Sequence, residues 1–270
     1  MSMLFIIQLI ASFFLGGAAV ALQTFVAEKV PKSISGIILS LPSTIVVNLF
    51  FLSRVLSIED FKKLLPVLPA PLGFSFVIIA VYIYVQRRIK DNSLNKLKAV
   101  IGTAIFATVV WALCSAPFAI FEMTNLWISL AIYALCITIT QIFFYKLDPK
   151  DVQLEEKPVS MQEKIFRSVL AGSMVGIAVF LAKILGPFWG GLMTMFPAAY
   201  LAGLIIFHHR YYCPKMSLKL FKTSPIGSTS LIVYAFAADY LLPAFGSYVG
   251  TFLALCVSSI FALILSKVVK

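Results

Sequence analysis

The chain has 270 residues, of which 61% are hydrophobic and 12% are charged, and its mean hydropathy is +0.99. A soluble domain is about 45–50% apolar and about 25% charged, so this composition excludes both a soluble enzyme and a disordered chain. Because a membrane-spanning helix needs about 20 apolar residues, the length allows roughly nine or ten spans. We therefore predict an all-α polytopic membrane protein that is embedded in the lipid bilayer.

Charges, prolines and asparagines divide the chain into nine apolar runs. The predicted transmembrane helices cover residues 4–27, 34–56, 64–86, 99–121, 126–146, 165–185, 188–208, 224–242 and 247–267. Since these runs are apolar all round, they are typical of spanning helices rather than of amphipathic surface helices. The first run lacks the basic residues that precede the apolar part of a cleaved signal peptide, so we interpret it as a retained first span.

The basic residues indicate how the chain crosses the membrane. Four of the 22, Arg54, Lys62, Lys63 and Lys183, fall on one side of nine predicted spans, and the other 18 fall on the opposite side. Cytoplasmic loops carry the excess of Lys and Arg, so we expect the N-terminus outside and the C-terminus in the cytoplasm of the cell (inner) membrane. The same rule explains the net charge of +11, and we expect no nucleic acid partner.

An internal repeat relates the two halves of the chain. Residues 13–42 align without a gap with residues 168–197, and short matches follow at 71–73 with 225–227 and at 101–103 with 249–251. The first four spans thus resemble the last four and run in the opposite direction, which is an inverted-topology repeat. We predict three units: residues 1–123 as the first four-helix repeat, 124–163 as a linker helix with a cytoplasmic loop, and 164–270 as the second repeat.

Three features of the second repeat carry a family resemblance. They are Gly172, the stretch Gly-Leu-Met-Thr-Met-Phe-Pro at 191–197, and Gly-Ser-Tyr-Val-Gly at 246–250. With these features, residues 168–265 resemble the GlpM-like family of small four-helix bacterial inner-membrane proteins. The first repeat fits more loosely, because Leu41 stands where the second has Phe196. The resemblance implies a tandem, inverted pair of such units and implies no substrate.

Two prolines at matching repeat positions mark the candidate binding site. A proline inside a helix removes one backbone hydrogen bond, and broken helices in matching positions of inverted halves point to a central site. A simple packing kink is the alternative interpretation. The candidate substrate-binding residues are Ser40, Pro42, Ser43, Thr44, Asn48, Thr194 and Pro197.

Ionisable residues inside the predicted spans are scarce. Asp239 is the one acid well inside an apolar run, so it is the candidate for proton coupling, with a hydrated interfacial carboxylate as the alternative. Residues 208–213, His-His-Arg-Tyr-Tyr-Cys, lack the spacing of metal ligands and are typical of a cytoplasmic membrane interface. We expect no metal, no other cofactor and, because hydrolase and phosphate-loop motifs are missing, no enzyme.

Two GxxxG pairs, Gly172 with Gly176 and Gly246 with Gly250, predict close helix crossings within the fold or at a homodimer face. The leading functional hypothesis is a small inverted-repeat secondary transporter or permease for a neutral or weakly charged small molecule. Its rival is a structural or accessory membrane subunit without transport of its own, and a channel is a third option. A polar pathway would favour transport, whereas a dry, closed interior would favour the accessory role.

Overall fold

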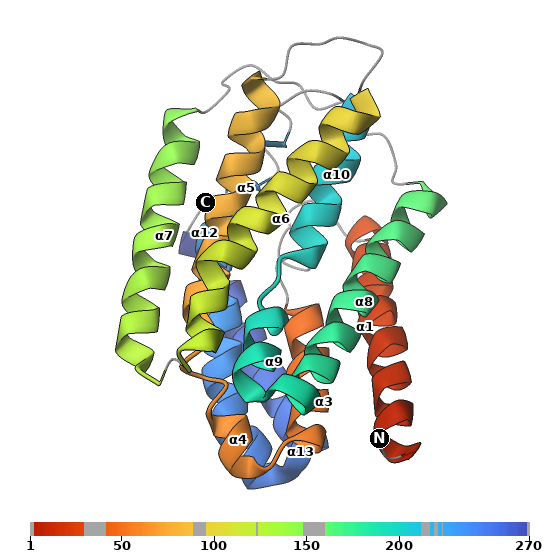
Figure 1. Ribbon diagram of the computed structural model, residues 1–270, viewed down its shortest axis with the longest axis vertical. Helices are drawn as coiled ribbons and strands as arrows, with labels where there is room; N and C mark the ends of the chain where they lie inside the picture. The colour runs from red at the N-terminus through yellow and green to blue at the C-terminus, as the bar shows by residue number, and fades with distance from the viewer. Residues whose placement is uncertain are drawn as a thin grey trace.

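The regular elements of the structure are all helices. The computed structural model describes residues 3–29, 42–88, 96–122, 124–147, 160–211, 217–218, 221–222 and 224–268, and in these ranges there is no strand (Figure 1). The helices are α1 (Met3–Lys29), α3 (Ser43–Val55), α4 (Ile58–Lys62), α5 (Pro69–Arg88), α6 (Lys96–Ile120), α7 (Leu126–Lys146), α8 (Met161–Leu185), α9 (Pro187–Thr194), α10 (Ala198–Tyr211), α12 (Ser224–Gly227) and α13 (Thr229–Val268). The all-α prediction is confirmed for this part of the chain.

Seven segments of the described chain are long and apolar enough to cross a membrane. One of them, α13, has 40 residues and bends at Gly246, where φ is 76° and ψ is 165°. Only glycine adopts this backbone region readily, so α13 supplies two of the predicted spans. The short apolar helix α3 is the described part of another span, whose predicted residues 34–41 lie outside the described ranges. In the part of the chain that the structure describes, the prediction of a polytopic α-helical membrane protein with about nine transmembrane helices is thereby confirmed.

The two halves meet where α1 crosses α8, and these helices run antiparallel (Figure 1). A Cβ atom on Gly17 would lie 2.9 Å from the carbonyl oxygen of Ser168, and a Cβ atom on Gly172 would overlap the carbonyl oxygen of Phe13. In the repeat alignment residue 13 corresponds to residue 168, and residue 17 to residue 172. The contact of Gly17 with Ser168 is therefore the counterpart of the contact of Gly172 with Phe13. Such reciprocity is what a two-fold relation between the halves requires, and it agrees with the inverted repeat.

Burial separates central spans from peripheral ones. In α5, and in the span formed by α9 and α10, 67% of the most apolar stretch is buried, compared with 22% in α7. The linker helix α7 packs against α5 and turns most of its surface outward. The candidate site on the α9–α10 span therefore lies in the best-covered part of the bundle.

The bundle has two ends, named here by the helices that mark them (Figure 1). The α4 end holds α4 and the beginning of α1. The α10 end holds the ends of α5 and α10 and the beginning of α8. Helix α4, which the sequence did not predict, has only five residues, and the hydroxyl of its N-cap residue Ser57 accepts a hydrogen bond from the Asp60 amide.

Candidate functional site

The break at Pro197 is complete rather than a kink. Helix α9 ends at Thr194, and α10 begins at Ala198, directly after the proline. The carbonyl oxygen of Met193, which a helical residue at position 197 would otherwise engage, accepts a hydrogen bond from the Phe196 amide at 3.1 Å. The prediction of a broken helix at Pro197 is therefore right, and the carbonyl four residues before this proline is paired locally.

Two other helices seal this break. The hydroxyl of Ser75 on α5 lies 2.8 Å from the carbonyl oxygen of Met195 and 2.9 Å from that of Pro71 in its own helix, so its one proton is shared between them. The same hydroxyl accepts a hydrogen bond from the indole nitrogen of Trp111 on α6 at 3.0 Å. The Trp111 ring packs edge-on against Phe196, with 5.0 Å between centroids. Because Ser75, Trp111 and Met195 are all buried, a protein group supplies a hydrogen bond to the Met195 carbonyl that the break leaves outside a helix.

Pro42 occupies the equivalent position in the first repeat. It is the N-cap residue of α3, and its carbonyl oxygen accepts a hydrogen bond from the Val46 amide at 2.8 Å. The carbonyl oxygen of Pro197 accepts the corresponding hydrogen bond from the Leu201 amide at 2.7 Å. Each proline therefore starts a helix at the same repeat position. The hydroxyl of Ser43 donates to the side-chain carbonyl of Gln23 on α1 at 2.6 Å, whereas Ser40 lies outside the described residues.

The remaining polar candidates differ in how their side chains are used. Thr194 is buried, and its hydroxyl donates to the Gly190 carbonyl at 2.8 Å within its own helix. Thr44 is half-buried on α3. Asn48, one turn later, is only 2% exposed, and its side-chain carbonyl oxygen has no hydrogen-bond partner among the described residues. A buried polar atom of this kind is uncommon in folded proteins. The packing of the described residues therefore does not account for the polarity of Asn48, nor for that of the Oδ1 atom of Asp239, which is also buried without a described partner.

A cavity of about 230 Å³ lies at the α4 end and not at the proline breaks. Its lining comes from α4 and the residues after it, from the turn before α7 and from the start of α9: Glu59, Lys62, Lys63, Pro66, Thr124 and Phe188. The structure does not bring the candidate substrate-binding residues into this cavity. Asp239 is half-buried on α13, and it interacts electrostatically with Lys62 of α4.

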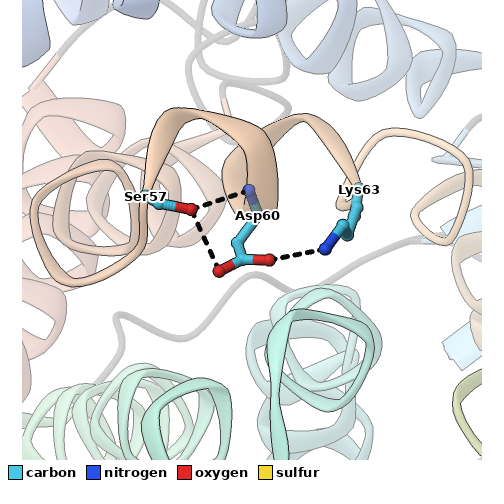
Figure 2. Close-up of polar contacts among 3 residues, drawn as sticks. All are labelled: Ser57, Asp60 and Lys63. Atoms are coloured by element: carbon cyan, nitrogen blue, oxygen red, sulfur yellow. Dashed lines mark hydrogen bonds and ion pairs between the residues drawn. The ribbon is translucent and has the colours of Figure 1, made fainter.

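Helix α4 carries its own charge network (Figure 2). The carboxylate of Asp60 accepts hydrogen bonds from the Lys63 ammonium at 2.7 Å and from the Ser57 hydroxyl at 3.0 Å. The Lys63 and Ser57 hydrogen bonds hold the pKa of Asp60 below its ordinary value, and Asp60 raises the pKa of Lys63. Both side chains are well exposed, so the pair stabilises α4 only weakly.

One buried polar pair was missed by the sequence reasoning. His208, which was assigned to a membrane interface, is wholly buried on α10, and its Nδ1 atom lies 3.0 Å from the hydroxyl of the equally buried Tyr82 on α5. The interface interpretation of residues 208–213 did not anticipate this buried contact. His209, its neighbour, is exposed, and no local sequence signal distinguishes the two histidines.

A family model matches part of the chain. Residues 164–270 match the model of a family described as a protein of unknown function, DUF3147. The match begins and ends with the predicted second repeat. Neither the curated proteins nor the solved structures give a match.

Proposed function

We propose that the protein is a small secondary transporter, or permease, for a neutral or weakly charged small molecule. One observation carries the proposal: antiparallel halves meet in a reciprocal crossing, and each starts a helix at the equivalent proline. Inverted halves with discontinuous spans are the architecture on which alternating access is built. The unpaired side-chain oxygen of Asn48 offers a hydrogen-bond acceptor next to one of these prolines.

The proposal also covers how the two halves are related and how the chain is oriented in the membrane. We infer that the chain is a tandem of GlpM-like units, since residues 168–265 carry that resemblance and residues 13–42 repeat residues 168–197. The distribution of Lys and Arg supports a cell-membrane location with the α4 end outside and the α10 end in the cytoplasm. A homodimer through the glycine pairs stays a prediction, because Gly172 and Gly250 here meet backbone atoms of their own chain.

The test uses variants that remove polarity and keep size. Purified protein is screened by thermal shift against polyols, sugars and neutral amino acids, because a bound ligand raises stability by about 2.7 kcal/mol at a concentration of 100 Kd. Any stabilising compound is then followed as radiolabelled uptake into proteoliposomes. We expect Asn48→Leu and Thr44→Val to abolish both responses with folding intact. Thr138→Val is the matched control, since Thr138 is exposed on α7 and its hydroxyl donates only to Ala134 of its own helix.

An accessory membrane subunit is the second candidate, and the sealed break around Met195 favours it. In that case the variants change stability without a selective loss of ligand response, and no compound in the panel is taken up. Unchanged uptake by the double variant Asn48→Leu, Thr44→Val would refute the site assignment while leaving transport intact.

A further inference from the structure

The cavity at the α4 end combines charged side chains of both signs with apolar ones. Its volume of about 230 Å³ is below the range of about 300–1,000 Å³ found for drug-sized ligands, so it suits a small solute. Phe188 is only 7% exposed, whereas the charged side chains from α4 are exposed. The lining consists of the α4 residues Glu59 and Lys62, the adjoining Lys63, the hydroxyl-bearing Thr124, and the apolar Pro66 and Phe188.

Two of the charged side chains are available to a ligand. Glu59 and Lys62 lie three positions apart, on one side of α4, yet within the described part of the chain neither makes a hydrogen bond or an ion pair through its side chain. Lys63, by contrast, is already held by Asp60 at 2.7 Å. The cavity therefore offers one free carboxylate and one free ammonium group on the same short helix.

An acid on α13 attracts Lys62 without occupying its donors. Asp239 interacts electrostatically with Lys62, but its Oδ1 atom is buried and has no hydrogen-bond partner among the described residues. A lysine ammonium group carries three donors. Lys62 can therefore keep this attraction and still donate a hydrogen bond to a solute carboxylate in the cavity.

The surrounding charges distinguish between classes of ligand. A simple anion would face more carboxylates than ammonium groups, and a simple amine would lie beside two lysines. A metal ion lacks a ligand set, since the described residues contain no group of three His, Cys, Asp or Glu side chains that could hold one. A solute with both charges meets a complementary group at each end. Besides Glu59, the acids that interact with the two lysines are Asp60, Glu122 and Asp239.

We propose that this cavity is the outer binding site for a small zwitterionic solute of the amino-acid class. The ammonium group of the solute donates to the carboxylate of Glu59, and Lys62 donates to the carboxylate of the solute. The Thr124 hydroxyl adds a polar contact, and Phe188 packs against the carbon chain. The inference rests on the proposed transport function, because it names the substrate class and the site that meets it on the side opposite the cytoplasm. A zwitterion has no net charge, as the proposed transport of a neutral solute requires.

The cavity is in direct contact with the broken span. Phe188 is the second residue of α9, the helix that ends at the break after Thr194, and α4 and α9 lie at the same end of the bundle (Figure 1). The segment after α4 also packs on α9, since a Cβ atom on Gly191 would lie 3.3 Å from the side chain of Leu64. With eight residues, α9 is about 12 Å long. A solute in the cavity thus touches the short helix whose other end is the break.

Matched probes test the two charges of the ligand separately. Binding of radiolabelled alanine, serine and leucine to the full chain in lipid nanodiscs is measured by scintillation proximity. Unlabelled ethylamine and propionate, which each keep one charged group of alanine, serve as competitors. We expect at least one amino acid to bind at millimolar concentration, and both competitors to be weaker by about tenfold or more, because each lacks one charge-assisted hydrogen bond.

Exposed variants then test the residues. Glu59→Gln and Lys62→Gln should each weaken binding by about tenfold, and both should fold, because the replaced side chains are exposed. Lys183→Gln is the matched control. It removes the same charge as Lys62→Gln from an exposed position in the last turn of α8, outside the cavity lining, and it should bind like wild type.

Three results overturn the proposal: no binding of any of the three amino acids, equally strong binding of ethylamine or propionate, or unchanged binding in Lys62→Gln. If binding follows the expected pattern but proteoliposomes take up none of the amino acids, the transport function fails while the binding site stands. If an amino acid is taken up and both Glu59→Gln and Lys62→Gln bind and transport it like wild type, only the cavity assignment fails.

Discussion

The crossing of α1 and α8 makes a sharp prediction, because two backbones touch there without side chains between them. In Gly172→Ala the new methyl group would overlap the carbonyl oxygen of Phe13, a backbone atom that cannot rotate away. The helices must move apart by a substantial part of an ångström, and gaps of about 0.5–1 Å forfeit a quarter to a half of each dispersion contact. Overpacking of this kind costs about 1–3 kcal/mol. At roughly 2–4 °C per kcal/mol for a chain of this size, we expect Tm to fall by several degrees.

Differential scanning fluorimetry of the purified protein in detergent measures the effect, and neighbouring glycines provide the controls. A Cβ atom on Gly176 would be in ordinary contact, 3.7 Å from Cβ of Phe13, and one on Gly102 would meet nothing within 4 Å. Since alanine is a better helix former than glycine by about 1 kcal/mol, both control variants should keep or raise Tm. Gly17→Ala should repeat the loss seen in Gly172→Ala, because the two-fold relation exchanges these positions. Equal Tm values for Gly172→Ala and Gly176→Ala would refute the reasoning.

Three further predictions concern the break, the orientation and α4. Ser75→Ala leaves the buried Met195 carbonyl without its donor, which costs about 1–3 kcal/mol and should lower Tm, and an unchanged Tm would show that the break is sealed by other groups. A C-terminal green fluorescent protein fusion should fluoresce and a C-terminal alkaline phosphatase fusion should be inactive, because we infer a cytoplasmic C-terminus; the reverse pattern would reject the orientation. The pKa of Asp60 is lower in the folded protein than its ordinary value of 3.8, so its stabilisation is present at neutral pH and is lost as the pH falls through the folded pKa. Asp60→Asn should therefore lose slightly less stability than wild type between pH 5 and pH 3, and an identical acid loss would argue against the pair with Lys63.

The spans could be predicted from the sequence because hydropathy depends only on local composition. The predicted helix at 126–146 has the same bounds as α7 (Leu126–Lys146), while α8 begins earlier than predicted, at Met161. Its first turn is polar, and it is held by the reciprocal hydrogen bonds of Ser160 and Glu163. Hydropathy cannot detect such a turn, nor the five-residue helix α4, because both lie in charged sequence. The glycine and proline positions of the repeat helped for another reason. A close helix crossing needs glycine, and a helix break favours proline. When two halves share one fold, each requirement occurs once in each half.

The candidate site was harder to predict, because polarity in the sequence does not say which groups satisfy each other. Thr194 and Asn48 are both polar residues in apolar runs, but the hydroxyl of Thr194 bonds to a carbonyl one turn back, whereas the oxygen of Asn48 has no described partner. A hydroxyl can be satisfied by its own helix, and an amide oxygen, which only accepts, needs a donor that the helix interior does not supply. Among predicted site residues in spans, amides are therefore stronger functional candidates than hydroxyls.

His208 shows that the burial of a side chain cannot be inferred from its sequence neighbours alone. Its neighbours in the sequence are His209 and Arg210, so the run is typical of an interface, yet α10 carries adjacent side chains about 100° apart. His208 consequently faces α5, where it meets Tyr82, 126 positions away in the chain, while His209 is exposed. A residue whose partner is that distant has no signature within its own segment. In a membrane bundle the helix packing, rather than the composition of the run, decides which ionisable groups are buried.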